Sequence, residues 1–160
     1  MHERAREFVD RVAEAHGVDV EVQEFPEGTK TAAAAADAVG CETGQIASSL
    51  VFVAGDDSVP VVVVTSGANR VDEAALADHL DADDAAMADA ETVTAATGWS
   101  IGGVPPLCHD GDPRLLFDPS LTDYDTVWAA AGTPRTVFPI DPERLLTLSG
   151  AEPAPVTSPK

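Results

Sequence analysis

Two apolar, largely β-branched runs near the middle of the chain constrain its fold more than any other feature. Residues 50–54 and 59–65 form these runs, and the turn-forming residues 55–58 separate them. Two strand-forming runs joined by such a short segment predict a β-hairpin. The second run is apolar on both faces, so we expect its strand to lie centrally in a sheet that is covered on both sides. Pro60 should lie near the start of this strand or at a bulge, because proline cannot donate to a strand ladder.

Helical periodicity and capping residues surround this hairpin. Apolar residues recur at helical spacing over residues 3–16, and Gly17 ends that helix. Thr31 is placed to cap an alanine-rich helix that ends before Gly40. Further helices are predicted to begin after three acidic caps, Asp72, Asp89 and Asp141. Alternating or β-branched segments predict the remaining strands at 18–23, 115–117, 127–131 and 136–140.

The order of these elements predicts the fold class. Helices do not alternate regularly with strands, which favours an α/β fold with a mixed, curved or barrel-like β-sheet and surrounding helices. The chain has 160 residues and is 44% apolar, which fits one domain with a substantial core. We assign that domain to residues 1–150. Residues 151–160 contain three prolines and no periodicity, and they are predicted to form a flexible tail.

The charge balance is strongly acidic. There are 28 acidic residues against 9 basic ones, for a net charge of −19, and the acidic residues are spread over every segment. This distribution indicates a solvated acidic shell of the kind found in halophilic proteins; an acidic surface for a cationic partner is the alternative. On charge alone, nucleic-acid binding would be disfavoured, and DNA is not an expected partner. No apolar run approaches the roughly 20 residues of a membrane span, and the N-terminus resembles no signal peptide, so a cytoplasmic location is expected.

Cysteine and histidine give no sign of a metal or a disulfide. The two cysteines, Cys41 and Cys108, stand in unrelated contexts, and a disulfide is not expected in an intracellular chain. The four histidines have no metal-ligand spacing. Neither a metal nor another cofactor is therefore predicted.

Two motifs carry more specific information. Residues 44–52 read GQIASSLVF, and residues 97–107 read TGWSIGGVPPL. Between them, residues 70–72 read RVD, and Met87-Ala88 precedes the second motif. In order and spacing the chain resembles the YbaK-like, prolyl-tRNA-synthetase-associated editing family, with its segments GQI-x-K-[ST]-LVF and TG[YF]-x-[IV]-GG-V-[SP]-P-[LF]. The resemblance runs from about residue 16 to residue 150.

This resemblance implies an activity and a set of site residues. The family's activity is hydrolysis, in trans, of the ester between tRNA and a mischarged small amino acid, usually cysteine or alanine on proline tRNA, without a metal. The implied partners are mischarged tRNA and an aminoacyl-tRNA synthetase. The implied catalytic residues are Gly102 and Gly103, whose backbone N–H groups would hold the developing oxyanion. The implied substrate-binding residues are Phe25, Lys30, Thr31, Ser48, Ser49, Thr97, Val104 and Pro106.

The physical chemistry of the glycine loop agrees with that role. An oxyanion site needs N–H donors that point at one spot before the reaction begins. Glycine allows a close backbone approach and unusual φ angles, and the prolines that follow restrict the remaining freedom. Taken alone, Gly-Gly-Val-Pro-Pro would indicate only a tight loop; its place between the matched segments favours a functional one.

One departure from the family pattern keeps alternatives open. Ser48 stands where the family usually has a lysine thought to contact the acceptor-end phosphate, and Lys30 is a candidate substitute cation. Serine can hydrogen-bond a phosphate but supplies no charge. A non-catalytic module that binds tRNA or a synthetase is therefore one alternative. A small-ester or thioester hydrolase that uses Cys108, beside His109, is another. Asp118 is expected to cap a helix, although a carboxylate near a pocket could orient water.

The net charge of −19 generates a testable expectation. Repulsion within the chain, and between chain and tRNA, acts over a Debye length of about 10 Å at 0.1 M salt and about 3 Å at 1 M. Stability and any tRNA-directed activity should therefore both rise from low to molar potassium chloride, the reverse of ordinary nucleic-acid binding. Circular dichroism measured beside activity separates the two effects. A fully folded protein at 0.1 M salt whose tRNA affinity falls steeply with added salt would contradict the acidic-shell interpretation.

Overall fold

The computed structural model describes residues 2–25, 31–111 and 113–160. The strands of the main sheet are β1 (Gln23–Glu24), β2 (Ile46–Ala54), β3 (Val59–Ser66), β5 (Ala85–Met87), β6 (Arg114–Phe117), β7 (Val127–Ala130), β8 (Thr136–Ile140) and β9 (Glu152–Pro153). A second, two-stranded sheet contains β4 (Asn69–Val71) and β10 (Thr157–Pro159). The helices are α1 (Glu3–His16), α2 (Ala32–Val39), α3 (Glu73–His79), α4 (Ala90–Thr97) and α5 (Pro142–Ser149), with short 3-10 helices η1 (Thr43–Gln45) and η2 (Pro119–Asp123).

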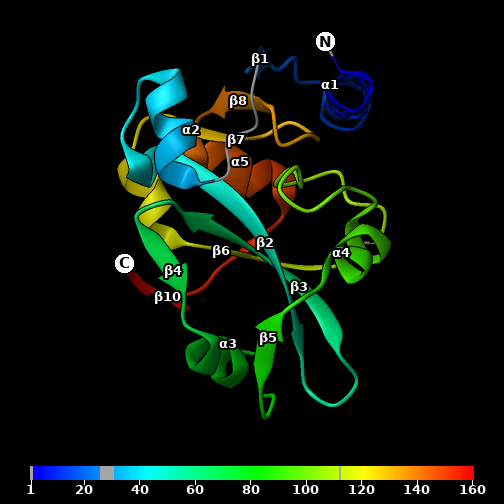
Figure 1. The fold of residues 1–160 in the computed structure, drawn as a ribbon, viewed down its shortest axis with the longest axis vertical. Helices are drawn as coiled ribbons and strands as arrows, with labels where there is room; N and C mark the ends of the chain where they lie inside the picture. Colours follow the sequence, from blue (N-terminus) through cyan, green and yellow to red (C-terminus); the bar gives the residue numbers. More distant parts are fainter. Residues whose placement is uncertain (1, 26–30, 112) are drawn as a thin grey trace.

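The main sheet is mixed and is organised about the β2–β3 hairpin (Figure 1). Its strand order is β1-β8-β7-β2-β3-β6-β9, and β5 pairs with the far end of β2. The hairpin is antiparallel, whereas β2 with β7 and β3 with β6 are parallel pairs. Pro60 is the second residue of β3, as its missing N–H requires. The predicted mixed α/β fold is thereby confirmed, with helices arranged around the sheet.

The middle of strand β3, residues 61–64, consists of four valines because both of its faces are covered there. Val62 and Val64 belong to the larger core cluster, which also contains side chains of α1, α5 and the loop after α4. Val61 and Val63 point to the other face, into a smaller cluster beneath α3. All four valines are at most 2% exposed. Burial on two faces explains why this strand lacks the polar–apolar alternation of a half-exposed one.

The predicted helix caps are present, but one predicted strand is not. The side chains of Thr31, Asp72 and Asp89 each accept a hydrogen bond from a backbone N–H in the first turn of their helix. Residues 18–23 are predicted to form a strand, yet pairing begins only at the last of them, Gln23, which opens β1. The valines of that segment belong to the larger core cluster or pack against it. Their alternation therefore reflects burial on one side and not strand pairing.

The prediction of a flexible tail over residues 151–160 is wrong. Strand β9 pairs in parallel with β6, and β10 pairs antiparallel with β4. Ala154 and Val156 are at most 1% exposed and belong to the cluster beneath α3. The buried side chains are small and separated by prolines, so they leave no periodic signal in the sequence. The last ten residues thus complete the second core cluster.

The packing of the C-terminal segment can be tested with one truncation of a side chain. Val156→Ala should lower the free energy of unfolding by about 2 kcal/mol, because it removes buried methyl groups and leaves a cavity. The matched control is Val59→Ala, since Val59 is 52% exposed at the start of β3. Urea unfolding of both variants measures the difference. Equal stabilities of the two variants would show that residues 151–160 do not contribute to the core.

Candidate functional site

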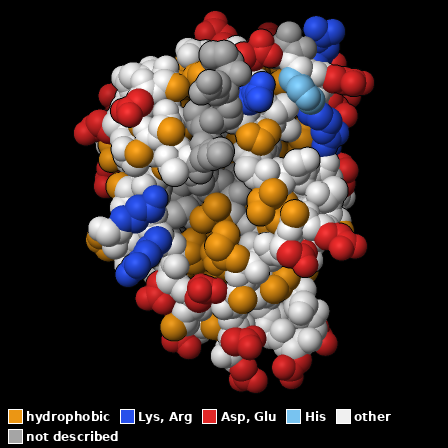
Figure 2. Space-filling model, in the orientation of Figure 1, with side chains coloured by type: hydrophobic (Ala, Val, Ile, Leu, Met, Phe, Trp, Pro, Cys, Tyr) orange, Lys and Arg blue, Asp and Glu red, His pale blue; other side chains and the backbone are white. Residues whose placement is uncertain are grey.

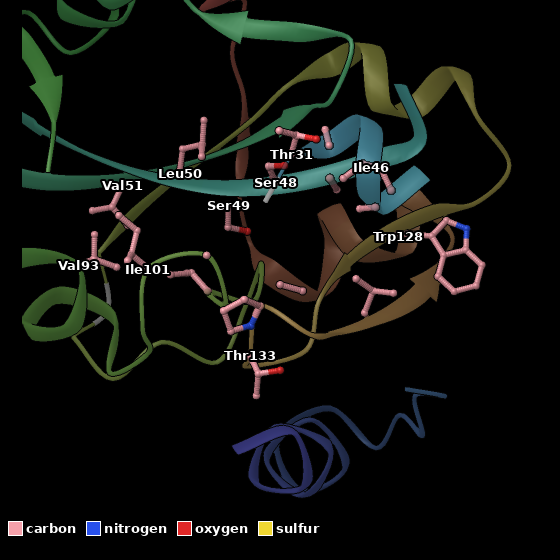
Figure 3. A pocket seen from close by; sticks show the side chains of 18 of the residues that line it. Thr31, Ile46, Ser48, Ser49, Leu50, Val51, Val93, Ile101, Trp128 and Thr133 are labelled. Carbon is pink, nitrogen blue, oxygen red and sulfur yellow. The ribbon is translucent and has the colours of Figure 1, made fainter. Parts of the chain in front are cut away.

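A cavity of about 200 Å³ opens between β2 and the loops on one side of the sheet (Figure 3). It is bounded by β2, the N-terminal end of α2, the loop that follows α4, and the end of β7 with the turn into β8. Its described lining is mostly apolar and carries no charged side chain. The lining side chains and backbone belong to Thr31, Ala32, Ala35, Ile46, Ala47, Ser48, Ser49, Leu50, Val51, Met87, Ala88, Val93, Ile101, Gly102, Val104, Trp128, Ala130, Thr133, Pro134, Thr136 and Val137.

The glycine-rich loop reaches the cavity through a tight turn. The Gly103 N–H donates to the Ser100 carbonyl oxygen at 2.9 Å, and Gly102 has φ of +85°. A side chain at Gly103 would place its Cβ 2.7 Å from the Thr133 Cα, so only glycine fits there. The loop and the β7–β8 turn therefore meet backbone to backbone. The Gly103 N–H is used within the turn, and its neighbours Gly102 and Val104 both line the cavity.

The base of this loop is fixed by α1. Trp99 is fully buried, and its indole N–H donates to the Cys108 carbonyl oxygen at 3.0 Å. Phe8 of α1 meets the indole edge to face, and the guanidinium of Arg4 lies 4.1 Å from the centre of the ring. Arg11 adds an ion pair with Asp110 at 3.0 Å. The aromatic and cation–π contacts of Trp99 thus hold one end of the loop against the helix, and the ion pair of Asp110 links the other end to it.

Strand β2 contributes the two adjacent serines of the first motif. Figure 3 shows Ser49 and Val51 directed from β2 toward the loops of Ile101 and Thr133, whereas Leu50 projects from the other face. Ser48 and Ser49 both line the cavity. The Ser49 hydroxyl oxygen is buried and has no hydrogen-bond partner among the described residues. Such a group costs roughly 1–3 kcal/mol unless a ligand or water satisfies it.

The structure brings together half of the residues that the sequence singled out. Thr31, Ser48, Ser49, Gly102 and Val104 line the cavity.

The other predicted site residues lie elsewhere. Thr97 is buried at the end of α4, where its hydroxyl bonds the Val93 carbonyl oxygen and the Trp99 N–H. Pro106 is buried outside the lining, and Gly103 packs on Thr133. Phe25 lines an adjoining surface hollow, beside Arg135, that shares Thr133, Pro134 and Thr136 with the cavity. Lys30 lies outside the described residues.

Several lining residues were missed because they come from distant parts of the chain. Trp128, Thr133 and Val137 belong to β7, β8 and the turn between them, which lie outside the two main motifs. Ile101 and Met87 stand at the cavity, and both are more than half exposed. Both residues occur inside the segments that match the family. The sequence alone, however, does not show that an apolar residue is exposed at a cavity.

The cysteine and histidine at the end of the loop are not arranged for catalysis. Neither Cys108 nor His109 belongs to the described lining. Burial raises the pKa of the Cys108 thiol, and the nearby Arg11 only partly offsets this. Burial lowers the pKa of His109, whose Nε2 lies 2.7 Å from the Pro105 carbonyl oxygen. A neutral thiol away from the cavity does not favour a cysteine nucleophile.

Asp118 is a structural anchor and not a cavity residue. One carboxylate oxygen accepts from the Ser66 N–H and the Asn69 side chain, and the other accepts from the N–H and hydroxyl of Ser120. Burial alone would raise the pKa of Asp118, but these hydrogen bonds outweigh it and hold the pKa below its usual range. The residue caps η2 and ties it to the end of β3.

Within the described part of the chain, no cluster of His, Cys, Asp and Glu could hold a metal ion. No helix there has both the length and the apolar character to cross a membrane.

Comparison with known proteins confirms the resemblance seen in the motifs. Residues 26–148 match the model of the aminoacyl-tRNA editing domain. The chain is 30% identical over 129 residues to the uncharacterized protein YwhH of Bacillus subtilis (strain 168), covering 81% of each chain. It is 32% identical over 97 residues to the proline–tRNA ligase of Limosilactobacillus fermentum, spanning only 17% of that protein. A crystal structure provisionally described as a trans-editing enzyme for prolyl tRNA synthetase superimposes with a TM-score of 0.90, at 37% identity over 99% of each chain.

The Asp118 anchor predicts a specific pH dependence of stability. Asp118→Asn should lower the free energy of unfolding by about 1–3 kcal/mol at neutral pH, because the amide places a donor opposite donors. The folded pKa is lowered, so the contribution of the carboxylate is complete above the unfolded pKa of about 3.9 and is lost as the pH falls through the folded pKa. Urea unfolding at several pH values should show the difference between wild type and variant shrinking below about pH 4. A difference that stays constant down to roughly pH 2 would refute the assigned ionisation.

Proposed function

The chain belongs to the aminoacyl-tRNA editing domain family, and on that premise we propose that it is a trans-acting deacylase for mischarged tRNA. It would hydrolyse the ester that joins a small amino acid, cysteine or alanine, to proline tRNA. The observation that carries the proposal is the small uncharged cavity between the glycine loop and the β2 serines. Its volume of about 200 Å³ lies below the roughly 300–1,000 Å³ of pockets for drug-sized ligands. It suits an aminoacyl group, with the nucleotide left outside.

The backbone of the loop supplies the chemistry in this proposal. Charge develops on the ester carbonyl oxygen as water attacks the carbonyl carbon. In this proposal the backbone amides of Gly102 and Val104 stabilise that charge. Both residues line the cavity, and the turn and Trp99 hold the loop that carries them. Preorganised donors of this kind supply a large share of catalysis in acyl transfer. The ester is already activated, so a positioned water suffices without a protein nucleophile.

Recognition of the tRNA must overcome the net charge of the protein. Figure 2 shows acidic side chains around most of the outline of one face, and basic side chains at its left side and in its upper right part. Such local basic groups on an otherwise acidic surface support binding of the phosphates at the acceptor end of the tRNA. Ser48, at the edge of the cavity, would contact that end without adding charge.

A binding module of the same fold, without turnover, is the second candidate. It is favoured by one observation: Ser48 replaces the lysine of the motif, and the described lining contains no cation. Release of free amino acid from alanyl-, cysteinyl- and seryl-tRNA by the protein alone, in molar potassium chloride, separates the two candidates.

The loop assignment predicts the effect of one substitution. Gly102→Val should lower deacylation by at least about 100-fold, because φ of +85° is unfavourable for a branched residue and the loop amides would turn away from the substrate. Melting temperature and near-ultraviolet circular dichroism report whether the fold persists. Cys108→Ala is the control and should keep full activity. Normal turnover in a folded Gly102→Val protein, or loss of turnover in Cys108→Ala, would contradict the assignment.

A further inference from the structure

Among the described residues, one edge of β2 has no partner strand where it borders the cavity. On that edge β2 pairs with β7 only at Ile46 and Ala47, and with β5 only over 52–54. The Val51 carbonyl oxygen accepts from the Ala88 N–H at 3.0 Å, which closes the far end of the gap. The strand edge is therefore open around Ser49, between two neighbours that hold it on either side.

The backbone of Ser49 faces into this gap. Successive residues of a strand direct their N–H and C=O groups to opposite edges. The Ile46 carbonyl oxygen accepts from the Gly67 N–H on the β3 side, whereas that of Val51 accepts on the opposite side. Ser49 is three residues from Ile46 and two from Val51, so its N–H and C=O point away from β3. Neither ladder includes Ser49 in the described part of the sheet.

The side chain of Ser49 is also unsatisfied. Its hydroxyl oxygen is buried against the cavity with no partner in the described chain. The hydroxyl and the backbone groups of Ser49 thus face the same cavity. The direction of the backbone follows from the strand pairing, and that of the hydroxyl from its burial against the cavity. Buried polar groups are normally paired, and groups left unpaired together at a cavity indicate a ligand.

We propose that Ser49 binds the α-amino group of the aminoacyl ester, so that the site accepts only esters whose α-amine is free. The inference rests on the proposed function and names its substrate class. The Ser49 carbonyl oxygen can only accept, and the serine hydroxyl can accept as well. Within the aminoacyl group itself, the ester oxygens are acceptors and the ammonium group holds the only donors. N-acylated esters, including peptidyl-tRNA, lose that charge and most of those donors and are excluded.

The test compares substrates that differ only at nitrogen. Wild-type protein, Ser49→Ala and Ser49→Thr are assayed with alanyl-tRNA and N-acetyl-alanyl-tRNA. Ser158→Ala, a serine of β10 remote from the cavity, is the matched control. Binding of the non-hydrolysable amide analogue 3′-alanylamino-3′-deoxyadenosine and its N-acetyl form is followed by tryptophan fluorescence, because Trp128 lines the cavity.

The expected pattern is specific to recognition of the amine. Ser49→Ala should lower kcat/KM for alanyl-tRNA about 10- to 100-fold, weaken the free-amine analogue similarly, and leave N-acetyl forms unchanged. Ser49→Thr keeps the hydroxyl and should restore most of the loss. The melting temperature of Ser49→Ala should not fall, since the hydroxyl has no partner to lose.

Two results would overturn the inference, and they differ from failure of the proposed function. Equal losses on free and N-acetylated substrates would assign Ser49 to the ribose or the ester and not to the amine. A lowered melting temperature with unchanged discrimination would make Ser49 structural. Absence of both deacylation and analogue binding in the wild type would instead reject the proposed function, and the inference with it.

Discussion

Burial of β3 on both faces is the constraint on which the rest of the molecule depends. Four consecutive valines fill two core clusters, so both faces of the sheet must be covered by other segments. One cover consists of α1, α5 and the loops, and the other consists of α3 with the last ten residues of the chain. The partner strand β2 is consequently held firmly along β3, and its other edge can be left open without loss of the strand. The cavity forms at that open edge.

The rigid wall opposite β2 has a different origin. It is a loop with little regular structure, and its order comes from Trp99, which is buried among Phe8, Arg4 and the loop's own backbone. Helix α1 lies outside the 26–148 range that matches the family model. A segment beyond the matched range therefore supports the part of the domain that carries its most recognisable motif.

The sequence was informative where local rules govern structure. The hairpin, the caps at Thr31 and Asp72, and the mixed sheet follow from β-branching, capping chemistry and the lack of regular helix–strand alternation. The motif segments located Ser48, Ser49 and Gly102 at one cavity, although Phe25, Thr97 and Pro106 fell outside it. Pairing at residues 152–159 could not be predicted, because it depends on small buried side chains whose partners are distant in sequence. The use of the Gly103 N–H inside its own turn is likewise a three-dimensional fact, as is the open edge beside Ser49.

The contact between Gly103 and Thr133 has a mechanical consequence. Two loops that touch backbone to backbone, with no side chain between them to rotate aside, cannot yield by exchanging rotamers. Any widening of the cavity must displace the glycine loop and the β7–β8 turn as one body, against Trp99 on one side and the sheet on the other. The size of the ligand that the cavity accepts then depends on one motion, the joint displacement of the two loops, which the surrounding packing opposes. Natural variation in that size should arise through the residues that project into the cavity, while the frame that carries them stays the same.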